Sequence, residues 1–229
     1  MTPLLEVIVT SVEEAREAER GGAGRLEVVR DLAHDGLTPG LDTVRAVCAA
    51  VSIPVRAMLR ATPAHEVRDA RTLEALGRLA AALAALPIDG LVVGFVRAGR
   101  VDPEAMRTVL AQVPACRVTF HRAIEATDDP LAAIDDLRRL RRVDRVLWSG
   151  GPGDWPTRRT RLAEAARRGA PGIGVIVGGG LTREGLLVLR DGPGLREFHV
   201  GRAARVPPEP EGRVRAHAVE ALVGALGQG

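Results

Sequence analysis

Residues 5–29 read LEVIVTSVEEAREAERGGAGRLEVV, two short apolar runs joined by a charged segment with helical spacing. The runs cover residues 4–9 and 25–29, and their Val, Ile and Leu content is typical of strands buried on both faces. Between them, residues 12–20 form an amphipathic helical pattern, and Ser11 is suited to cap its N-terminus. The segment therefore predicts a strand–helix–strand unit with two parallel strands.

The same alternation of strand and helix continues along the chain. Six more apolar runs predict strands at residues 55–60, 91–95, 117–121, 145–149, 173–178 and 197–201. Further helical patterns lie at residues 41–51, 71–86, 103–112, 130–141, 155–168, 183–190 and 214–226. Thr182 is a helix start signal, as are Asp102 and Asp129 with Pro at the next position. The pattern amounts to eight consecutive strand–helix units.

Eight such units predict an α/β fold, a (β/α)8 TIM barrel in which residues 1–229 form a single domain. The alternative is an open doubly wound sheet, which would carry a glycine-rich phosphate turn after its first strand. The residues at that place read VTSVEEA, which is no such turn, and no Gly/Ser linker divides the chain. In a barrel, the functional residues are expected at the C-terminal ends of the strands.

Composition excludes several classes of protein. All 32 basic residues are Arg, and they alternate with acids in stretches such as EEAREAER, which is typical of solvated helix faces. Clustered positive charge and stacking aromatic residues are both missing, so we expect no nucleic-acid partner. No apolar run reaches the roughly 18 residues of a membrane span, and the N-terminus has no basic leader. We therefore expect a cytoplasmic protein with no membrane partner.

The missing lysine also excludes two kinds of catalysis. A Schiff-base aldolase and a PLP enzyme both need a lysine amine, so PLP is not expected. The sequence carries no NAD signature either, which argues against hydride transfer. Its two cysteines, Cys48 and Cys116, are isolated and form no C-x-x-C pair, as expected for free thiols in a reducing cytosol.

Polar residues interrupt strands that should be apolar, and they are the candidate site. Glu6 and Glu27 lie in the first two strands, Arg60 and His121 end the third and fifth, and His199 lies in the eighth. If these side chains point inward, the two acids should meet Arg60, with both histidines nearer the barrel mouth. The competing interpretation is a structural network in which the acids merely neutralise Arg60.

The remaining histidines and glycines extend this picture. His34 and His65 lie in predicted loops, where we expect solvated side chains. In barrels, the loops after the last two strands frequently hold a phosphate on backbone amides and a helix N-terminus. The residues suited to such an anion site here are Gly178, Gly179, Gly180, Gly201 and Arg202. The segment SGGPG at 149–153 is a third flexible turn on the same face.

Taken together, these segments resemble the CutC family, named for copper homeostasis and built on a TIM barrel. The matching stretches keep the family's order over residues 4–205, and they are LEVIVTSVEEAREAERGGAGRLEVV, DGLTPG, SIPVRAMLR, VTFHRAIEATDDPLAAIDDL, VDRVLWSGG, VGGGLT and REFHVGRAAR. The resemblance implies a role in copper homeostasis, with copper as a ligand. It also implies that the typical polar positions of the family are Glu6, Glu27, Arg60, His121, Arg122, Ser149 and His199.

The sequence departs from the family pattern in two places. The family usually continues its third strand as R-P-R-G-G-D-F, whereas residues 60–66 read RATPAHE. Family members often carry Cys in the first two strands, where this chain has Ile8, Val9 and Val29. Thiolates are the natural ligands of Cu(I), so the remaining histidines and carboxylates would suit Cu(II) better.

Two functions follow, and a third interpretation is a scaffold with a vestigial site. The first is the copper homeostasis that the resemblance implies. The second is an enzyme with isomerase-type or lyase-type proton transfer on a small anionic or phosphorylated metabolite. Its catalytic residues would be His121 as proton shuttle, Glu6 or Glu27 as the group that orients it, and Arg60 on a carboxylate or enolate oxygen. The substrate-binding residues would be Arg122, Ser149, Gly178, Gly179, Gly180, His199, Gly201 and Arg202. A homodimer is compatible with the sequence.

Overall fold

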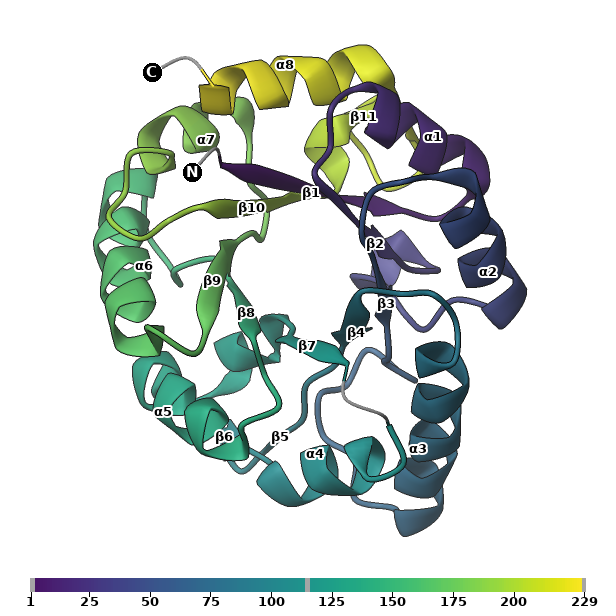
Figure 1. Cartoon of the computed structure of the whole chain (residues 1–229). Coiled ribbons are helices and arrows are strands. Elements are labelled where there is room, and N and C mark those ends of the chain that lie inside the picture. Colours follow the sequence, from purple (N-terminus) through teal and green to yellow (C-terminus); the bar gives the residue numbers. More distant parts are fainter. Residues whose placement is uncertain (1–2, 114–115, 228–229) are drawn as a thin grey trace.

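Eight parallel strands close into a barrel, as the sequence predicts (Figure 1). The computed structural model describes residues 3–113 and 116–227. Neighbouring strands follow the order β1–β10–β9–β8–β7–β4–β3–β2 and back to β1. The barrel strands are β1 Leu4–Val9, β2 Arg25–Val28, β3 Val55–Met58, β4 Gly90–Val92, β7 Arg117–Phe120, β8 Arg145–Trp148, β9 Gly174–Val177 and β10 Glu197–Val200.

An α-helix lies between each pair of consecutive barrel strands, and another follows the last, so helices surround the barrel (Figure 1). They are α1 Val12–Arg20, α2 Leu41–Ala50, α3 Ala70–Ala84, α4 Pro103–Leu110, α5 Pro130–Leu140, α6 Trp155–Gly169, α7 Arg183–Leu189 and α8 Ala216–Gly227. The predicted caps are confirmed: Ser11, Asp102, Asp129 and Thr182 each accept a hydrogen bond from a backbone amide of the first turn.

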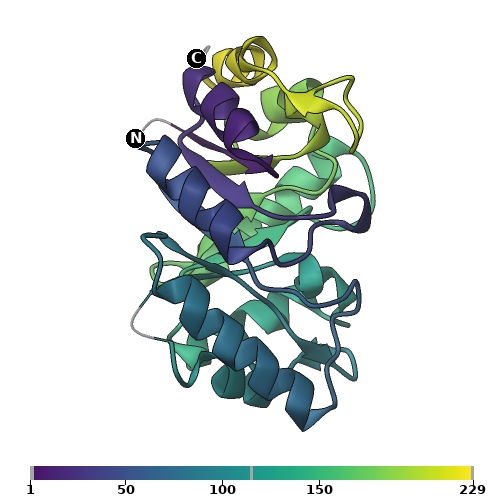
Figure 2. The same ribbon diagram turned by 90° about the vertical axis from the view of Figure 1, so that its right-hand side faces the viewer.

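The connections after several strands contain short secondary-structure elements. They are two hairpins, β5 Val96–Arg97 with β6 Arg100–Val101 and β11 Arg205–Val206 with β12 Arg213–Val214, and the 3-10 turns η1 Leu32–His34, η2 Arg122–Ala126 and η3 Arg202–Ala204. Figure 2 shows the segments that follow β2, β3 and β10 on one side of the molecule, away from the N-terminus. This side is the C-terminal mouth of the barrel.

β1 ends at Val9 as predicted, whereas the other seven barrel strands end one to three residues earlier than the sequence predicts. The third predicted strand reaches residue 60, but β3 ends at Met58. Arg60 instead exchanges hydrogen bonds with Thr38: its amide donates to Thr38 Oγ1 at 2.8 Å, and its carbonyl accepts from Thr38 N at 3.0 Å. Its backbone is therefore tied to the loop after β2 rather than to β4, and its side chain lies at the mouth.

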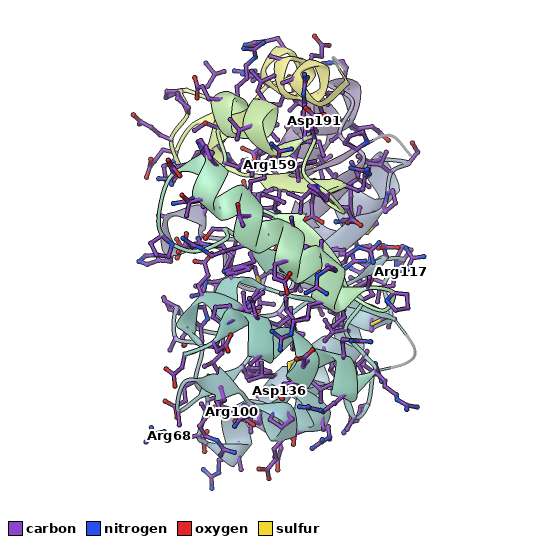
Figure 3. All side chains as sticks on the ribbon, turned by 90° about the vertical axis from the view of Figure 1, so that its left-hand side faces the viewer. Arg68, Arg100, Arg117, Asp136, Arg159 and Asp191 are labelled. Carbon is purple, nitrogen blue, oxygen red and sulfur yellow. The ribbon has the colours of Figure 1, made fainter. Side chains whose placement is uncertain are left out.

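Alternation along each strand separates two environments. On β1, Leu5, Val7 and Val9 pack in the main apolar core beneath the helices, whereas Glu6 and Ile8 face the barrel interior. The outer surface is polar, with pairs such as Arg100 and Asp136 at 3.3 Å and Arg159 donating to the Asp191 carbonyl at 2.9 Å (Figure 3). Among the described residues, no helix combines the length and apolar character that a bilayer span requires.

Candidate functional site

The register of the strands places charged residues side by side inside the barrel. Glu6 on β1 is directly opposite His199 on β10 and Arg25 on β2. Glu27 on β2 is opposite Arg56 on β3. Because side chains alternate between the two faces of a strand, residues in register share a face, and here that face is the interior.

The N-terminal half of the interior is a closed ion-pair network, which we call the basal network. Arg25 donates to Glu6 and, at 2.7 Å, to Glu197, which also accepts from Arg145. Fully buried Arg56 binds Asp144 at 2.9 Å and Asp89 at 3.1 Å, and it donates to Thr119. The basal network therefore consists of Glu6, Arg25, Arg56, Asp89, Thr119, Asp144, Arg145 and Glu197.

The expected pairing of Glu6 and Glu27 with Arg60 is wrong. Glu6 is neutralised by Arg25 instead. The Arg60 guanidinium lies beyond the end of β3 and contacts backbone carbonyls, those of residues 34–36 at 3.4–3.5 Å and that of Pro63. The cause is position along the strand: Arg56, four residues earlier, occupies the interior beside Glu27, so Arg60 reaches only the mouth.

Glu6, Glu27 and His199 form one buried cluster above the basal network. His199 Nδ1 lies 2.7 Å from Glu6 Oε1 and 3.5 Å from Glu27 Oε2. One oxygen of each acid and the imidazole nitrogen lie within 4.8 Å of one another. Glu27 Oε1 is buried and has no hydrogen-bond partner among the described residues. The cluster therefore has one free acceptor, on Glu27.

The two glutamates of this cluster differ in acidity. Burial raises the pKa of Glu27 to about 7, with the Glu6 charge adding to the rise and His199 opposing it. Burial would also raise the pKa of Glu6, but the charge of Arg25 and the hydrogen bond from His199 hold it well below its usual range. Burial lowers the pKa of His199, yet the Glu6 hydrogen bond and the Glu27 charge raise it above its ordinary value. Of the two glutamates, Glu27 is thus the one poised between its two protonation states near neutral pH.

A cavity of about 590 Å³ opens above this cluster at the C-terminal mouth. This volume is typical of sites for small molecules. Its lining includes these residues singled out in the sequence: Glu27, Arg60, His121, Arg122, Gly179, Gly180, His199, Gly201 and Arg202. Ile8, Val29 and Met58 add an apolar part to the lining.

Three other residues singled out in the sequence lie outside the lining. Glu6 is sealed below it by Arg25 and His199. The amide of Ser149 donates to Glu125 at 3.1 Å, while its hydroxyl accepts from the Gly151 amide at 3.2 Å. At Gly178 a Cβ would come 2.6 Å from Leu147 and 3.1 Å from His199, so this glycine allows close packing. Their contacts support the lining residues.

His121 is held in a single orientation and tautomer. Its Nδ1 accepts a hydrogen bond from the Ala123 amide at 3.1 Å, so the proton of the neutral imidazole resides on Nε2. Burial, together with His65 and Arg60, lowers the pKa of His121 well below its ordinary value. A Cβ on Gly94 would lie 2.9 Å from Nδ1, so the glycine makes room for the ring. His121 therefore presents an N–H donor from a neutral ring.

His65 is not the solvated loop residue that the sequence suggests. It lines the cavity, its ring centroid lies 5.4 Å from that of His121, and its buried Nδ1 has no partner among the residues that the structure describes. The Val96 amide donates a hydrogen bond to the His65 carbonyl at 2.9 Å, which holds the loop around His65 against the cavity. No pattern in the neighbouring sequence predicts this contact. His34, by contrast, is exposed and pairs with Asp31 at 2.9 Å.

Arg122 follows His121 in the chain, and its side chain lies beside the glycine turn at residues 179–180. It donates to Glu125 at 2.7 Å, and a Cβ on Gly179 would come 3.2 Å from its Nε. Gly179 has a φ of 97° and Gly180 a φ of 74°, and their amides donate to no described residue. Glu125 was not predicted as a site residue, although its spacing of three residues from Arg122 suits a pair on one helical turn.

The cysteines lie away from this site. Cys48 is on α2 and Cys116 precedes β7, and neither lines the cavity. Burial raises the pKa of both thiols, which disfavours the thiolate form. The donor groups of the site are therefore carboxylates, imidazoles and guanidiniums.

Comparison with known proteins agrees with the architecture. The sequence model of the CutC family matches residues 3–204. A CutC family protein of Xanthomonas axonopodis pv. citri is 35% identical over 212 residues, covering 90% of this chain and 88% of the relative. The copper homeostasis protein cutC homolog of Mus musculus is 36% identical over 200 residues, covering 86% and 72%.

Solved structures share the fold. A crystal structure of CutC from Streptococcus agalactiae superposes with a TM-score of 0.79 at 22% identity, covering 87% of this chain and 98% of the other. A thiamine phosphate pyrophosphorylase of Pyrococcus furiosus superposes with a TM-score of 0.61 at 14% identity, covering 97% and 95%. The family match over most of the chain and the relatives above 30% identity show that this chain belongs to the CutC family.

Proposed function

We propose that this protein is an enzyme that moves a proton on a small anionic metabolite, by isomerase-type or lyase-type chemistry. The observation that carries the proposal is Glu27, a buried carboxyl at the bottom of the cavity with one free oxygen and a pKa of about 7. A general acid–base group works best when its pKa lies near the working pH. If the carboxyl of Glu27 served only stability, both of its oxygens would be expected to accept hydrogen bonds.

His121 acts in this proposal as a donor to an oxyanion. The Ala123 amide occupies Nδ1, so the Nε2–H is the group left to bind substrate. A neutral imidazole N–H stabilises the negative charge that develops on a carbonyl oxygen as a neighbouring carbon loses its proton. This role differs from the proton shuttle expected from the sequence, and the base is Glu27.

The reaction then needs no redox partner. The ionised Glu27 carboxylate takes a proton from a carbon next to a carbonyl group, and the C–H electron pair moves toward the carbonyl oxygen to form an enolate. Return of that proton from Glu27 to a different carbon of the conjugated enolate re-forms the carbonyl group and completes an isomerisation. In an elimination, the enolate instead re-forms the carbonyl group as a leaving group departs from the β-carbon with its bonding electrons, and Glu27 releases its proton to solvent.

Charge at the mouth favours an anionic substrate. Arg60, Arg122 and Arg202 line the cavity, together with the free amides of Gly179 and Gly180. Arginine forks and exposed backbone amides both bind carboxylate and phosphate groups. These groups would hold the unreactive end of the metabolite and orient its reacting carbon toward Glu27.

Deuterium exchange tests the proposal directly. Carboxylates, keto acids and sugar phosphates that raise the melting temperature of the protein are incubated with it in D2O, and loss of a C–H signal is followed by NMR. Glu27→Gln should lower the exchange rate by about 10²–10⁴-fold, while Glu74→Gln on the exposed face of α3 should leave it unchanged. Wild-type exchange retained in Glu27→Gln, or no exchange with any stabilising compound, would refute the proposal.

Copper binding is a second candidate, favoured by the Glu6–Glu27–His199 cluster. Two carboxylates and one imidazole are ligands that Cu(II) accepts, whereas Cu(I) prefers thiolates. The fit is partial, because Glu6 already binds Arg25 and His199, whereas Glu27 Oε1 has no partner among the described residues. Copper would be the cargo of this protein, consistent with the names of its relatives.

Calorimetric titration with Cu(II) and Cu(I) tests this candidate. Cu(II) should bind the wild type and lose affinity in His199→Ala, with Cys48→Ser/Cys116→Ser as the control that retains binding. Equal binding by His199→Ala, or binding that depends on the cysteines, would rule out the cluster as the site.

A further inference from the structure

One wall of the cavity, formed by Arg60, His65, His121 and Arg122, carries polar atoms that no described residue satisfies. Arg60 Nε, His65 Nδ1 and Arg122 Nε are buried, and none has a hydrogen-bond partner among the described residues. Arg60 as a whole is only 9% exposed. Buried polar groups are normally paired, so three free nitrogens in one wall indicate a missing ligand.

The charges in this wall are poorly balanced. Arg122 has Glu125 at 2.7 Å and the exposed Asp35 at 3.8 Å as counterions. Among the described residues, the Arg60 guanidinium donates only to backbone carbonyls. Burial and the charge of Arg122 lower the pKa of Arg60, against the opposing effect of Asp35. Burial and the charges of Arg60 and Arg122 likewise lower the pKa of His65. An anion among these side chains would relieve the excess of positive potential.

We infer that this wall is an oxyanion-binding subsite in which His65 is a direct ligand contact beside Arg60 and Arg122. The ligand group is a carboxylate or a phosphate. The inference deepens the proposed function, because it assigns the anionic end of the substrate to this wall, while proton transfer takes place at Glu27.

His65 is placed for this role by its surroundings. Its carbonyl accepts from the Val96 amide at 2.9 Å, which fixes the loop, and its ring lies tilted by 50° against that of His121. His65 lines the cavity, and its buried Nδ1 has no hydrogen-bond partner in the part of the chain that the structure describes. A bound oxyanion would accept a hydrogen bond from His65 Nδ1 when this nitrogen carries a proton.

Inorganic phosphate and acetate are the probes that test the subsite. In the 229-residue protein with ¹⁵N-labelled histidine, phosphate at pH 7 should shift the ring signals of His65 and His121. The signals of His217, which is exposed on α8, should stay unchanged. His65→Gln should bind phosphate about tenfold more weakly, as expected for loss of a hydrogen bond to a charged group. The matched control is His217→Gln, which alters an exposed histidine of α8 outside the cavity lining.

The acetate titration distinguishes the two ligand chemistries, because the tighter probe identifies the group that the wall prefers. Absence of a His65 shift with both probes in the wild type would overturn the inference, as would an unchanged affinity in His65→Gln. Neither measurement needs catalysis. Glu27→Gln should retain phosphate binding while losing deuterium exchange, so failure of the subsite and failure of the proposed proton transfer give different results.

Discussion

The two halves of the barrel interior contain the same kinds of residue and differ in how their charges are satisfied. In the basal network, Arg25, Arg56 and Arg145 each bind carboxylates directly. At the mouth, Glu27 Oε1 and the Nε atoms of Arg60 and Arg122 have no partner among the described residues. Barrel interiors are commonly filled by Val, Ile and Leu, so charge in both halves is unusual.

The difference separates a structural use of buried charge from a functional one. A satisfied network resists change, because loss of one member strands its neighbours in a medium of low polarity. Unsatisfied groups destabilise the free protein but are ready for a ligand, which supplies the missing partner. The basal network thus supports the fold, and the mouth retains the capacity to bind.

Breaking the basal network should have the largest effect on stability. Arg25→Met leaves the Glu6 carboxylate, 2% exposed, without its cation, and should lower the free energy of unfolding by about 3–5 kcal/mol. Urea unfolding followed by circular dichroism measures this change. Arg45→Met removes an exposed pair with Asp42 on α2 and should change stability by no more than about 0.5 kcal/mol. Similar losses in both variants would contradict a special role for the network.

Removing the Glu27 charge at the mouth should stabilise the fold, in contrast to the loss of Arg25. Glu27 has a folded pKa of about 7 against an ordinary value of 4.5, so its ionisation destabilises the folded state. Glu27→Gln should therefore raise the free energy of unfolding by about 1–3 kcal/mol at pH 8 and have little effect near pH 4.5. The same urea assay at the two pH values measures it. A destabilised variant at pH 8 would show that Glu27 belongs with the structural charges.

The sign of this pH dependence follows from the direction of each pKa shift. Below pH 4.5, Glu27 is protonated in both the folded and the unfolded state, and its penalty grows as pH rises toward 7. Glu6 behaves in the opposite way: its lowered pKa stabilises the fold above its ordinary pKa, and this contribution is lost as pH falls. His199, with a raised pKa, stabilises the fold below its ordinary pKa and loses that effect as pH rises.

The smallest expected effect is the difference in protonation between His199 and His121 during a pH titration of the wild-type protein. His199 faces Glu6 and should become protonated at a pH above 6.5, whereas His121 faces cations and should remain neutral between pH 8 and 6. Two-dimensional ¹⁵N NMR of the imidazoles, assigned with single His→Gln variants, reports both events and should show the proton of His121 on Nε2. A His121 proton on Nδ1 would remove the donor role proposed for this residue.

Much of the architecture is predictable because its signals are local. The caps at Ser11 and Asp129 bind amides two or three residues ahead, so a short sequence window contains both partners. Strand alternation also made Glu6, Glu27 and His199 candidates for the inward faces of their strands, and the structure places them there. Their approach to the C-terminal mouth follows from the general geometry of parallel barrels.

The pairing of the charges was not predictable in this way. Arg25 binds Glu197, which lies 172 positions later in the sequence, and the residues around either one do not predict this pairing. The expected contact of Arg60 with the acids failed because β3 presents Arg56 to them first. His65 was misjudged because a hydrogen bond from Val96 draws its loop into the mouth.

Sequence alone determined the barrel, its helix caps, the family and the face on which polar residues gather, since each depends on local periodicity or on matching stretches of residues. Tertiary structure alone decided which charges neutralise one another and which remain free, since that depends on the register between strands distant in sequence. The division has a physical cause. Secondary structure arises from contacts within a few residues, whereas the pKa of a buried group depends on every charge and surface that the closed barrel brings around it.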